Sequence, residues 1–191
     1  MENRILLLGD ELFGPCGEAA LRFSELLLAK EQTRKLQFIL NAPIPYSLKE
    51  LQKKIAMDVT GKQASKIIVG IGLHEIKTGK DFSYLKELFD FIFSEIKQKS
   101  NARIFVLTIP LAFCPEAVSV TEALNQFFFS SEDARLSVFD FNKAFTEFSE
   151  SQKANGKFAR TLLDDTYLPT SITETFLGMF LQESMSDILN G

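Results

Sequence analysis

The sequence predicts an α/β fold in which amphipathic helices cover both faces of a parallel β-sheet. Three observations lead to this prediction. Short apolar runs occur five times, each is followed by a segment with apolar residues at helical spacing, and loops rich in polar residues, Gly or Pro separate the two. Such alternation favours a parallel sheet, because each helix returns the chain to the same edge. No repeat or linker interrupts it, so we expect one domain over residues 1–191.

Five apolar runs are expected to form strands that are buried on both faces. Each run has four to seven residues and contains mainly Leu, Ile, Val and Phe. A run of this length, bounded by turn residues, is typical of a strand in a covered parallel sheet. The five runs are Arg4–Gly9, Leu36–Leu40, Lys66–Ile71, Arg103–Ile109 and Leu136–Phe139.

Apolar residues spaced by three and four positions predict the helices between these strands. The first helix covers Glu18–Lys30. Ser47 and Glu50 form a capping box, in which the serine oxygen accepts an amide hydrogen of the first turn and the glutamate reaches back, so a second helix begins there. A long helix carries Phe82 to Ile96, and Pro115 can occupy the first turn of the next helix.

Two more helices are expected after the last strand. A short one covers Asn142–Phe148, and the polar residues 151–160 follow it as a surface loop. Ser171 and Glu174 repeat the spacing of a capping box, which predicts the start of the C-terminal helix. This helix is expected to bury four apolar side chains, those of Ile172, Phe176, Phe180 and Ile188.

The composition argues against several classes of protein. The formal net charge is -4 and Lys and Arg do not cluster, so we expect neither nucleic-acid binding nor membrane binding. The first apolar run is too short for a signal peptide, and no run of about 18 apolar residues is present to span a bilayer. Two cysteines do not make a disulfide framework. We therefore expect a cytoplasmic protein.

Functional residues are expected at the carboxyl ends of the strands, where open parallel sheets bind ligands. The loops that meet there are Asp10–Gly17, Asn41–Tyr46, Gly72–Gly79, Pro110–Pro115 and the stretch before the last helix. They lack the G-x-G-x-x-G spacing of dinucleotide sites and a phosphate cradle rich in Ser, Thr and Gly. Bound flavin or nucleotide would indicate a different class of binding domain, but these loops lead us to expect no cofactor.

Residues 5–12, ILLLGDEL, resemble the first sequence block of the SGNH (GDSL-like) hydrolases, an apolar strand that runs into G-D-S-L. The nucleophilic serine of that block falls on Glu11. The second block is roughly N-x-G-x-x-G and supplies a glycine amide to the oxyanion hole. It falls on residues 41–46, where Pro43 and Tyr46 replace its glycines.

Two further blocks follow in the same order. Residues 68–75, IVGIGLHE, resemble a strand followed by G-x-N-D, with His74 at the oxyanion asparagine and Glu75 at the next acid. Residues 164–169, DDTYLP, resemble D-x-x-H-P. Asp165 matches the aspartate of that block, and the catalytic histidine falls on Leu168. The resemblance therefore spans nearly the whole chain.

This resemblance implies a three-layer, flavodoxin-like fold with strand order 2-1-3-4-5, in a family of esterases, lipases and carbohydrate deacetylases. A serine hydrolase needs a hydroxyl nucleophile, a base and oxyanion donors. Attack by the Glu11 carboxylate would give an anhydride with no benefit over attack by water, and Leu168 cannot carry a proton. We therefore expect a degenerate member, a non-catalytic pseudoenzyme that binds a small molecule or a protein partner. Asp10, often structural in this family, is expected to accept loop amide hydrogens.

Another interpretation keeps catalysis of the esterase or deacetylase type at a non-standard site. Glu11, His74 and Asp165 are expected to converge, and a carboxylate–His–carboxylate group could move protons or bind a metal. Alternatively, Cys16 near a helix start, where a thiolate is favoured, could be the nucleophile with His74 as its base. In the simplest interpretation, His74 only hydrogen-bonds Glu11 or Asp165, Cys16 is an inert loop residue, and no metal binds.

Overall fold

A five-stranded parallel sheet forms the centre of the protein. The computed structural model describes residues 4–13, 18–30, 36–41, 47–154 and 162–190. The strands are β1 (Arg4–Gly9), β2 (Gln37–Asn41), β3 (Lys66–Gly70), β4 (Arg103–Leu107) and β5 (Leu136–Phe139). They are parallel and lie in the order β2-β1-β3-β4-β5. The predicted fold class, the implied strand order and the positions of the five strands are confirmed.

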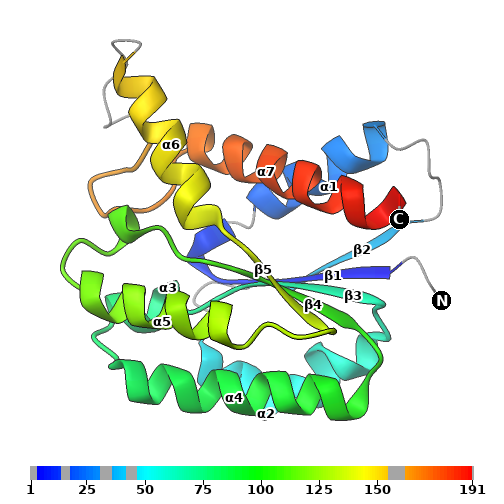
Figure 1. Cartoon of the computed structure of the whole chain (residues 1–191). Coiled ribbons are helices and arrows are strands. Elements are labelled where there is room, and N and C mark those ends of the chain that lie inside the picture. The colour runs from blue at the N-terminus through cyan, green and yellow to red at the C-terminus, as the bar shows by residue number, and fades with distance from the viewer. Residues whose placement is uncertain (1–3, 14–17, 31–35, 42–46, 155–161, 191) are drawn as a thin grey trace.

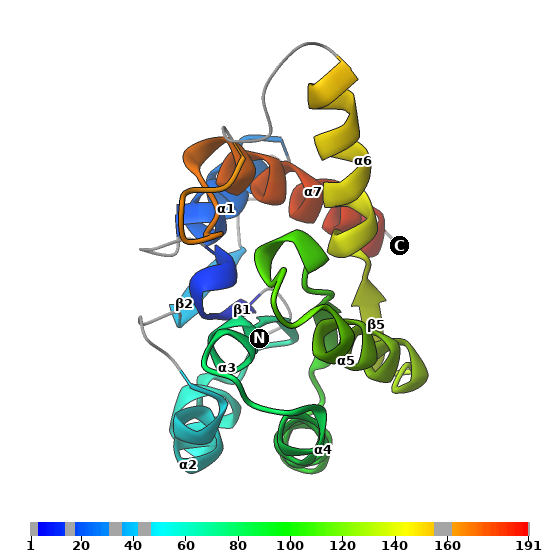
Figure 2. The same ribbon diagram turned by 90° about the vertical axis from the view of Figure 1, so that its left-hand side faces the viewer.

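Helices cover both faces of the sheet and give the three layers (Figures 1 and 2). On one face lie α1 (Glu18–Lys30), α6 (Phe141–Ala154) and α7 (Ser171–Asn190). On the other lie α2 (Leu48–Asp58), α4 (Phe82–Lys99) and α5 (Val118–Ser130). The connections contain the short helix α3 (Leu73–Lys77) and three 3-10 turns, η1 (Glu11–Phe13), η2 (Thr60–Lys62) and η3 (Leu111–Phe113). None of the helices described is both long and apolar enough to cross a membrane.

The capping box predicted at Ser47 and Glu50 is present, whereas the one predicted at Ser171 and Glu174 is wrong. The Ser47 hydroxyl oxygen accepts the Glu50 amide hydrogen at 3.2 Å, and the Glu50 carboxylate accepts the Ser47 amide hydrogen at 3.5 Å. At α7, Ser171 is already the first helical residue. The carbonyl oxygen of Thr170 accepts the Glu174 amide hydrogen at 2.9 Å, so the cap position is one residue earlier than predicted.

The predicted buried face of helix α7 is correct only in part. Ile172 is 45% exposed, while Phe176, Phe180 and Ile188 are half-buried against the core. The fully buried row consists of Thr173, Leu177, Leu181 and Met185. The reason is the close approach of α7 to α1, since a Cβ on Gly178 would lie 3.3 Å from the backbone nitrogen of Phe23. The ring of Phe176 therefore faces α6, where it stacks on the ring of Phe148 with 4.1 Å between the ring centroids.

Two predicted loops are shorter than expected, and a third is longer. Residues 151–154 continue α6, because they are polar but contain no helix breaker. The segment Gly72–Gly79, predicted as a loop, contains α3. Residues after Pro115 remain outside α5, which begins only at Val118. Local polarity therefore predicted the loops less accurately than apolar runs predicted the strands.

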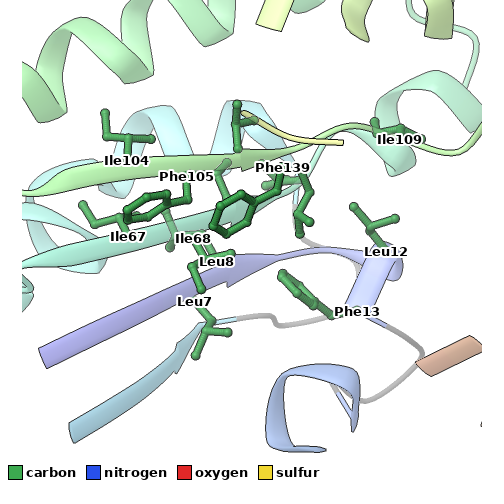
Figure 3. Packing of buried hydrophobic residues seen from close by; sticks show 14 of the residues in the cluster. Leu7, Leu8, Leu12, Phe13, Ile67, Ile68, Ile104, Phe105, Ile109 and Phe139 are labelled. Carbon is green, nitrogen blue, oxygen red and sulfur yellow. The ribbon is translucent and has the colours of Figure 1, made fainter. Parts of the chain in front are cut away.

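Two glycines on neighbouring strands make room for the ring of Phe13. Gly9 of β1 and Gly70 of β3 are partners in the sheet register. A Cβ on Gly9 would lie 1.8 Å from Cδ2 of Phe13, and a Cβ on Gly70 would lie 2.8 Å from its Cε2. The ring is fully buried and lies beside the end of β1 (Figure 3). This packing fixes η1 and with it the position of Glu11, the first residue of η1.

We expect Gly9→Ala to lower the free energy of unfolding by about 1–3 kcal/mol, the typical cost of adding carbon to a packed core. Urea denaturation measures this loss. In a Phe13→Leu background the same substitution should cost less, because the smaller side chain leaves space for the methyl group. Equal losses in the two backgrounds would show that Phe13 is not what limits the space at Gly9.

Candidate functional site

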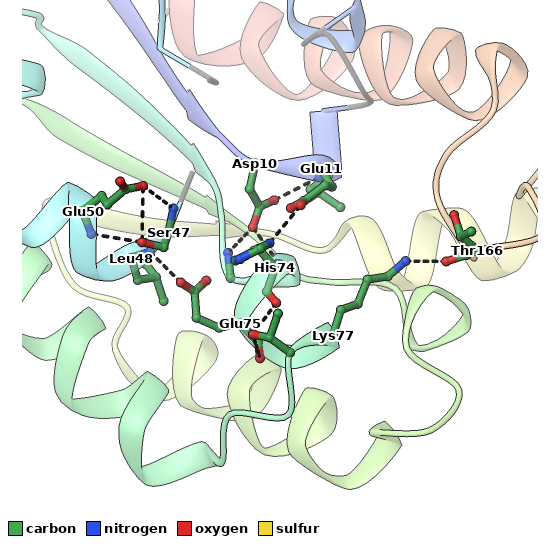
Figure 4. A network of polar contacts seen from close by, with 12 residues as sticks. Asp10, Glu11, Ser47, Leu48, Glu50, His74, Glu75, Lys77 and Thr166 are labelled. Carbon is green, nitrogen blue, oxygen red and sulfur yellow. Dashed lines mark hydrogen bonds and ion pairs between the residues drawn. The ribbon is translucent and has the colours of Figure 1, made fainter. Parts of the chain in front are cut away.

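A fully buried carboxylate joins the two loops that form the site. Asp10 accepts amide hydrogens from Leu12 at 2.9 Å, from Gly72 at 2.7 Å and from His74 at 3.1 Å. Gly72 and His74 lie at the start of α3, where amides have no partner within the helix. Asp10 therefore shapes its own turn, as predicted, and also caps α3 (Figure 4).

The same burial changes the acidity of this group. Burial raises the pKa of Asp10 from 3.8 to about 7, and the neighbouring Glu11 also acts to raise it. The three amide hydrogens that it accepts act in the opposite direction. Asp10 consequently exchanges its proton near neutral pH, although its role in the structure is to accept hydrogen bonds.

Glu11 and His74 form the side-chain pair at the centre of the site. Nδ1 of His74 lies 3.0 Å from Oε1 of Glu11, and the two side chains are 28% and 14% exposed. The other carboxylate oxygen of Glu11 is buried and has no hydrogen-bond partner among the described residues. No described residue bonds to Nε2 of His74. The predicted contact between Glu11 and His74 is confirmed, and each member keeps one polar atom available.

Asp165, the third residue of the predicted group, is not brought to this pair within the described structure. Its side chain is exposed and makes no hydrogen bond or ion pair with a described residue. The neighbouring Asp164 orders this loop instead, accepting amide hydrogens from Thr166 at 2.8 Å and from Leu168 at 2.9 Å. Across the described parts of the chain, no group of three His, Cys, Asp or Glu side chains could hold a metal.

The two cysteines differ in what can be said of them. Cys16, together with Pro43 and Tyr46 of the second block, lies outside the described residues, so the Cys16–His74 hypothesis stays a prediction. Cys114 is buried and is a free thiol. Burial raises the pKa of Cys114 to about 11. Its sulfur therefore stays protonated at neutral pH and is a poor nucleophile.

Glu75 has a structural role that the sequence did not predict. It is 2% exposed, and its Oε1 accepts the amide hydrogen of Leu48 at 2.7 Å, at the start of α2. Its other oxygen is buried without a hydrogen-bond partner in the described part of the chain, and burial raises the pKa of Glu75 above its ordinary value. This carboxyl ties α3 to α2 just below the Glu11–His74 pair (Figure 4).

A cavity of about 390 Å³ opens beside α3, and sequence reasoning missed it. Its walls come from α3, from the segment after β4 and from the loop before α7. The lining residues are Ile76, Lys77, Gly79, Phe113, Cys114, Pro115, Glu116, Ala117, Thr166 and Tyr167. The Lys77 ammonium donates to the carbonyl oxygen of Thr166 at 2.6 Å. Lys77 follows His74 by three residues, so recognising α3 as a helix would have placed both on one side of it.

Solved structures share this architecture. An acetyl xylan esterase, AlAXEase, superposes with a TM-score of 0.77 and 14% identity over 95% of this chain and 98% of that chain. A Parabacteroides merdae protein described as a GDSL-like lipase gives 0.77 and 13% over 97% and 96%. The chain has the SGNH hydrolase fold. A lipase/acylhydrolase from Enterococcus faecalis, also of this fold, gives 0.77 and 15% over 98% and 97%.

These likenesses establish the SGNH fold alone. No protein-family profile matches the sequence, and no curated protein matches it either. The Glu11–His74 pair lies just beyond the carboxyl ends of β1 and β3, which are neighbours in the sheet order β2-β1-β3-β4-β5. Doubly wound folds bind their ligands outside the carboxyl ends of such strands.

Protonation of Asp10 should make stability depend on pH. Because the pKa of Asp10 rises from 3.8 to about 7 on folding, its contribution is fully present below about pH 4 and is lost as the pH rises through 7. Asp10→Asn should remove this component and leave the one that Glu75 produces in the same direction. It should also cost about 1–3 kcal/mol throughout, because the amide cannot accept all three backbone hydrogens.

Urea denaturation between pH 4 and pH 8 measures both effects. Glu25→Gln, which changes an exposed carboxylate on α1, serves as the control and should leave the profile unchanged. If Asp10→Asn and wild type lose stability in parallel across this range, the carboxyl at Asp10 does not titrate as we expect.

Proposed function

We propose that this protein is an SGNH-fold pseudoenzyme that binds a small molecule at the carboxyl edge of its sheet without hydrolysing esters. One observation carries the proposal. Glu11, on which the nucleophilic serine of the resembled family falls, has its carboxylate bonded to His74 at 3.0 Å. A serine mechanism requires a hydroxyl at this position and a base that removes its proton. Here the carboxylate is itself a proton acceptor.

The rest of the site supports the same conclusion. Leu168, on which the catalytic histidine falls, is a half-buried residue packed against the core. His74, on which the oxyanion asparagine falls, directs Nδ1 to Glu11. Neither side chain takes the role of its counterpart. A leucine cannot transfer a proton, and when Nδ1–H of His74 donates to Glu11 the other ring nitrogen of the neutral imidazole carries a lone pair and has no hydrogen to offer an oxyanion.

Two features of the site support binding of a small molecule. The Asp10 carboxylate holds both loops, and the cavity of about 390 Å³ lies one turn along α3 from His74. Volumes of about 300–1,000 Å³ are usual for small-molecule sites. The structural neighbours named above are described as an esterase and as lipases, and the cavity of this chain opens at the carboxyl edge of its sheet. We propose that this chain uses it for binding.

One observation favours a second candidate, an active hydrolase with a non-standard site. A carboxylate that orients a histidine through one ring nitrogen leaves the other nitrogen to take a proton from water. Glu11 and His74 have this arrangement, and both side chains are partly exposed. The exposed Asp165 and the undescribed Cys16 complete the groups that such an enzyme could use.

Hydrolysis assays separate the two candidates. We expect p-nitrophenyl acetate and acetylated xylose to be hydrolysed no faster by the wild-type protein than by its His74→Ala and Glu11→Gln variants, with or without divalent metal ions. The physical reason is that position 11 carries a carboxylate and not a hydroxyl nucleophile. Glu25→Gln, at an exposed position on α1, controls for non-specific effects of the substitution. Turnover that disappears in His74→Ala but survives in Glu25→Gln would establish the hydrolase and refute the pseudoenzyme.

A further inference from the structure

We infer that the cavity beside α3 binds a small monocarboxylate with a short apolar chain, its carboxylate against Lys77 and its chain against the cavity floor. This inference rests on the proposed function, because it names the class of ligand that the site would hold without turnover. It follows from an amphipathic lining, from a cation that forms no ion pair with a described carboxylate and from the loop that lines one side.

The floor of the cavity is apolar. The most buried side chains of its lining belong to Ile76, Phe113 and Cys114, which are 2%, 0% and 4% exposed. The thiol of Cys114 stays protonated, so it adds no charge to this surface. A hydrocarbon chain placed here would leave water for an apolar wall, at a gain of roughly 25 cal/mol for each Å² buried.

The rim is polar and carries the cation. Lys77, Glu116 and Thr166 are exposed there. Lys77 uses one ammonium hydrogen for the Thr166 carbonyl oxygen and forms no ion pair with a described carboxylate. Its other hydrogens are available to an anion. Although Lys77 remains exposed, partial removal of water lowers its pKa. The charges of Asp164, Glu11 and Asp10 oppose that change, and a bound carboxylate would add to their effect.

The loop that closes the cavity is held in an unusual conformation. Tyr167 has a φ of 59°, in the left-handed region that side chains other than glycine rarely adopt. The Asp164 side chain fixes the turn on either side of it, and Lys77 joins the turn to α3 through Thr166. This conformation places Tyr167 in the lining of the cavity. A strained residue at a ligand site is consistent with a binding role.

The size of the cavity limits the ligand. A volume of about 390 Å³ is at the small end of the usual range for ligand pockets. The lining of this small space combines one cation with buried apolar side chains, so the ligand needs one charged end and one short apolar end. A polyanion such as inorganic phosphate satisfies the rim but not the floor.

A pair of matched ligands tests the charge requirement on the wild-type protein. Hexanoate and hexanamide have the same chain and differ in charge, and isothermal titration calorimetry compares their affinities. We expect hexanoate to bind at least about tenfold more tightly, because its bond to the ammonium is charge-assisted. Inorganic phosphate should also bind at least about tenfold more weakly than hexanoate. Equal affinities, or no hexanoate binding up to about 10 mM, would overturn the inference.

Substitution of Lys77 tests the position of the carboxylate. In Lys77→Gln the preference for hexanoate over hexanamide should disappear, while Lys49→Gln, at an exposed position on α2 outside the cavity, should keep it. Far-ultraviolet circular dichroism checks that both variants fold. A preference that survives in a folded Lys77→Gln protein would mean that another group holds the carboxylate.

Tyr167→Gly separates the backbone conformation from the side chain. Glycine adopts a positive φ without strain, so the thermal midpoint should be no lower than that of wild type, whereas hexanoate affinity should fall several-fold. Gln63→Gly is the matched control, since Gln63 also has a positive φ, of 53°, and lies outside the cavity. Unchanged hexanoate affinity in Tyr167→Gly would exclude Tyr167 from the site.

The two proposals fail in different ways. Ester turnover that depends on His74 would refute the pseudoenzyme while leaving the preference for hexanoate measurable. Absence of that preference would refute the ligand class while leaving the hydrolysis result unaffected. The two assays therefore use the same protein but give independent answers.

Discussion

The hydrogen bonds accepted by the Asp10 carboxylate are the interaction on which the site depends. One buried group satisfies amides from the loops that follow β1 and β3, and each of those amides would otherwise be buried without a partner. Glu11 is the next residue after Asp10, and the backbone amide of His74 donates a hydrogen bond to the Asp10 carboxylate. The side chains of Glu11 and His74 meet because the same carboxyl positions the backbone of both.

The framework of the site and its chemistry are therefore separable. Asp10, Glu75 and the Phe13 ring hold the loops and helices in place, and none of them requires a reactive group at position 11. An SGNH fold can keep its geometry after the nucleophile position changes, which is why the fold alone does not decide the activity. The energy that maintains the site comes from buried amides and packing. It would be present whether the site performs catalysis or only binds.

Apolar runs predicted the strands well. The pattern is strongest in β1, β3 and β4, which are largely buried, whereas the edge strands β2 and β5 are partly exposed, contrary to the expected burial on both faces. The family resemblance supplied the order of the strands. The features that sequence reasoning missed depend on distant contacts. Helix α3 is capped by Asp10, which is 62 positions from Gly72. The buried face of α7 is set by Gly178 against α1. In the site, the Glu11–His74 contact was predicted, but Asp165 stays exposed because Asp164 makes the hydrogen bonds that fix their common loop.

The place of Tyr167 at the cavity rim has an optical consequence. The chain contains no tryptophan and only three tyrosines, so its intrinsic ultraviolet emission comes from very few rings. One of these rings lines the cavity, on a loop that Lys77 joins to α3. A ligand in the cavity would change the surroundings of the Tyr167 ring and hence its fluorescence. No tryptophan emission would mask that change. The unlabelled protein therefore carries its own reporter of occupancy.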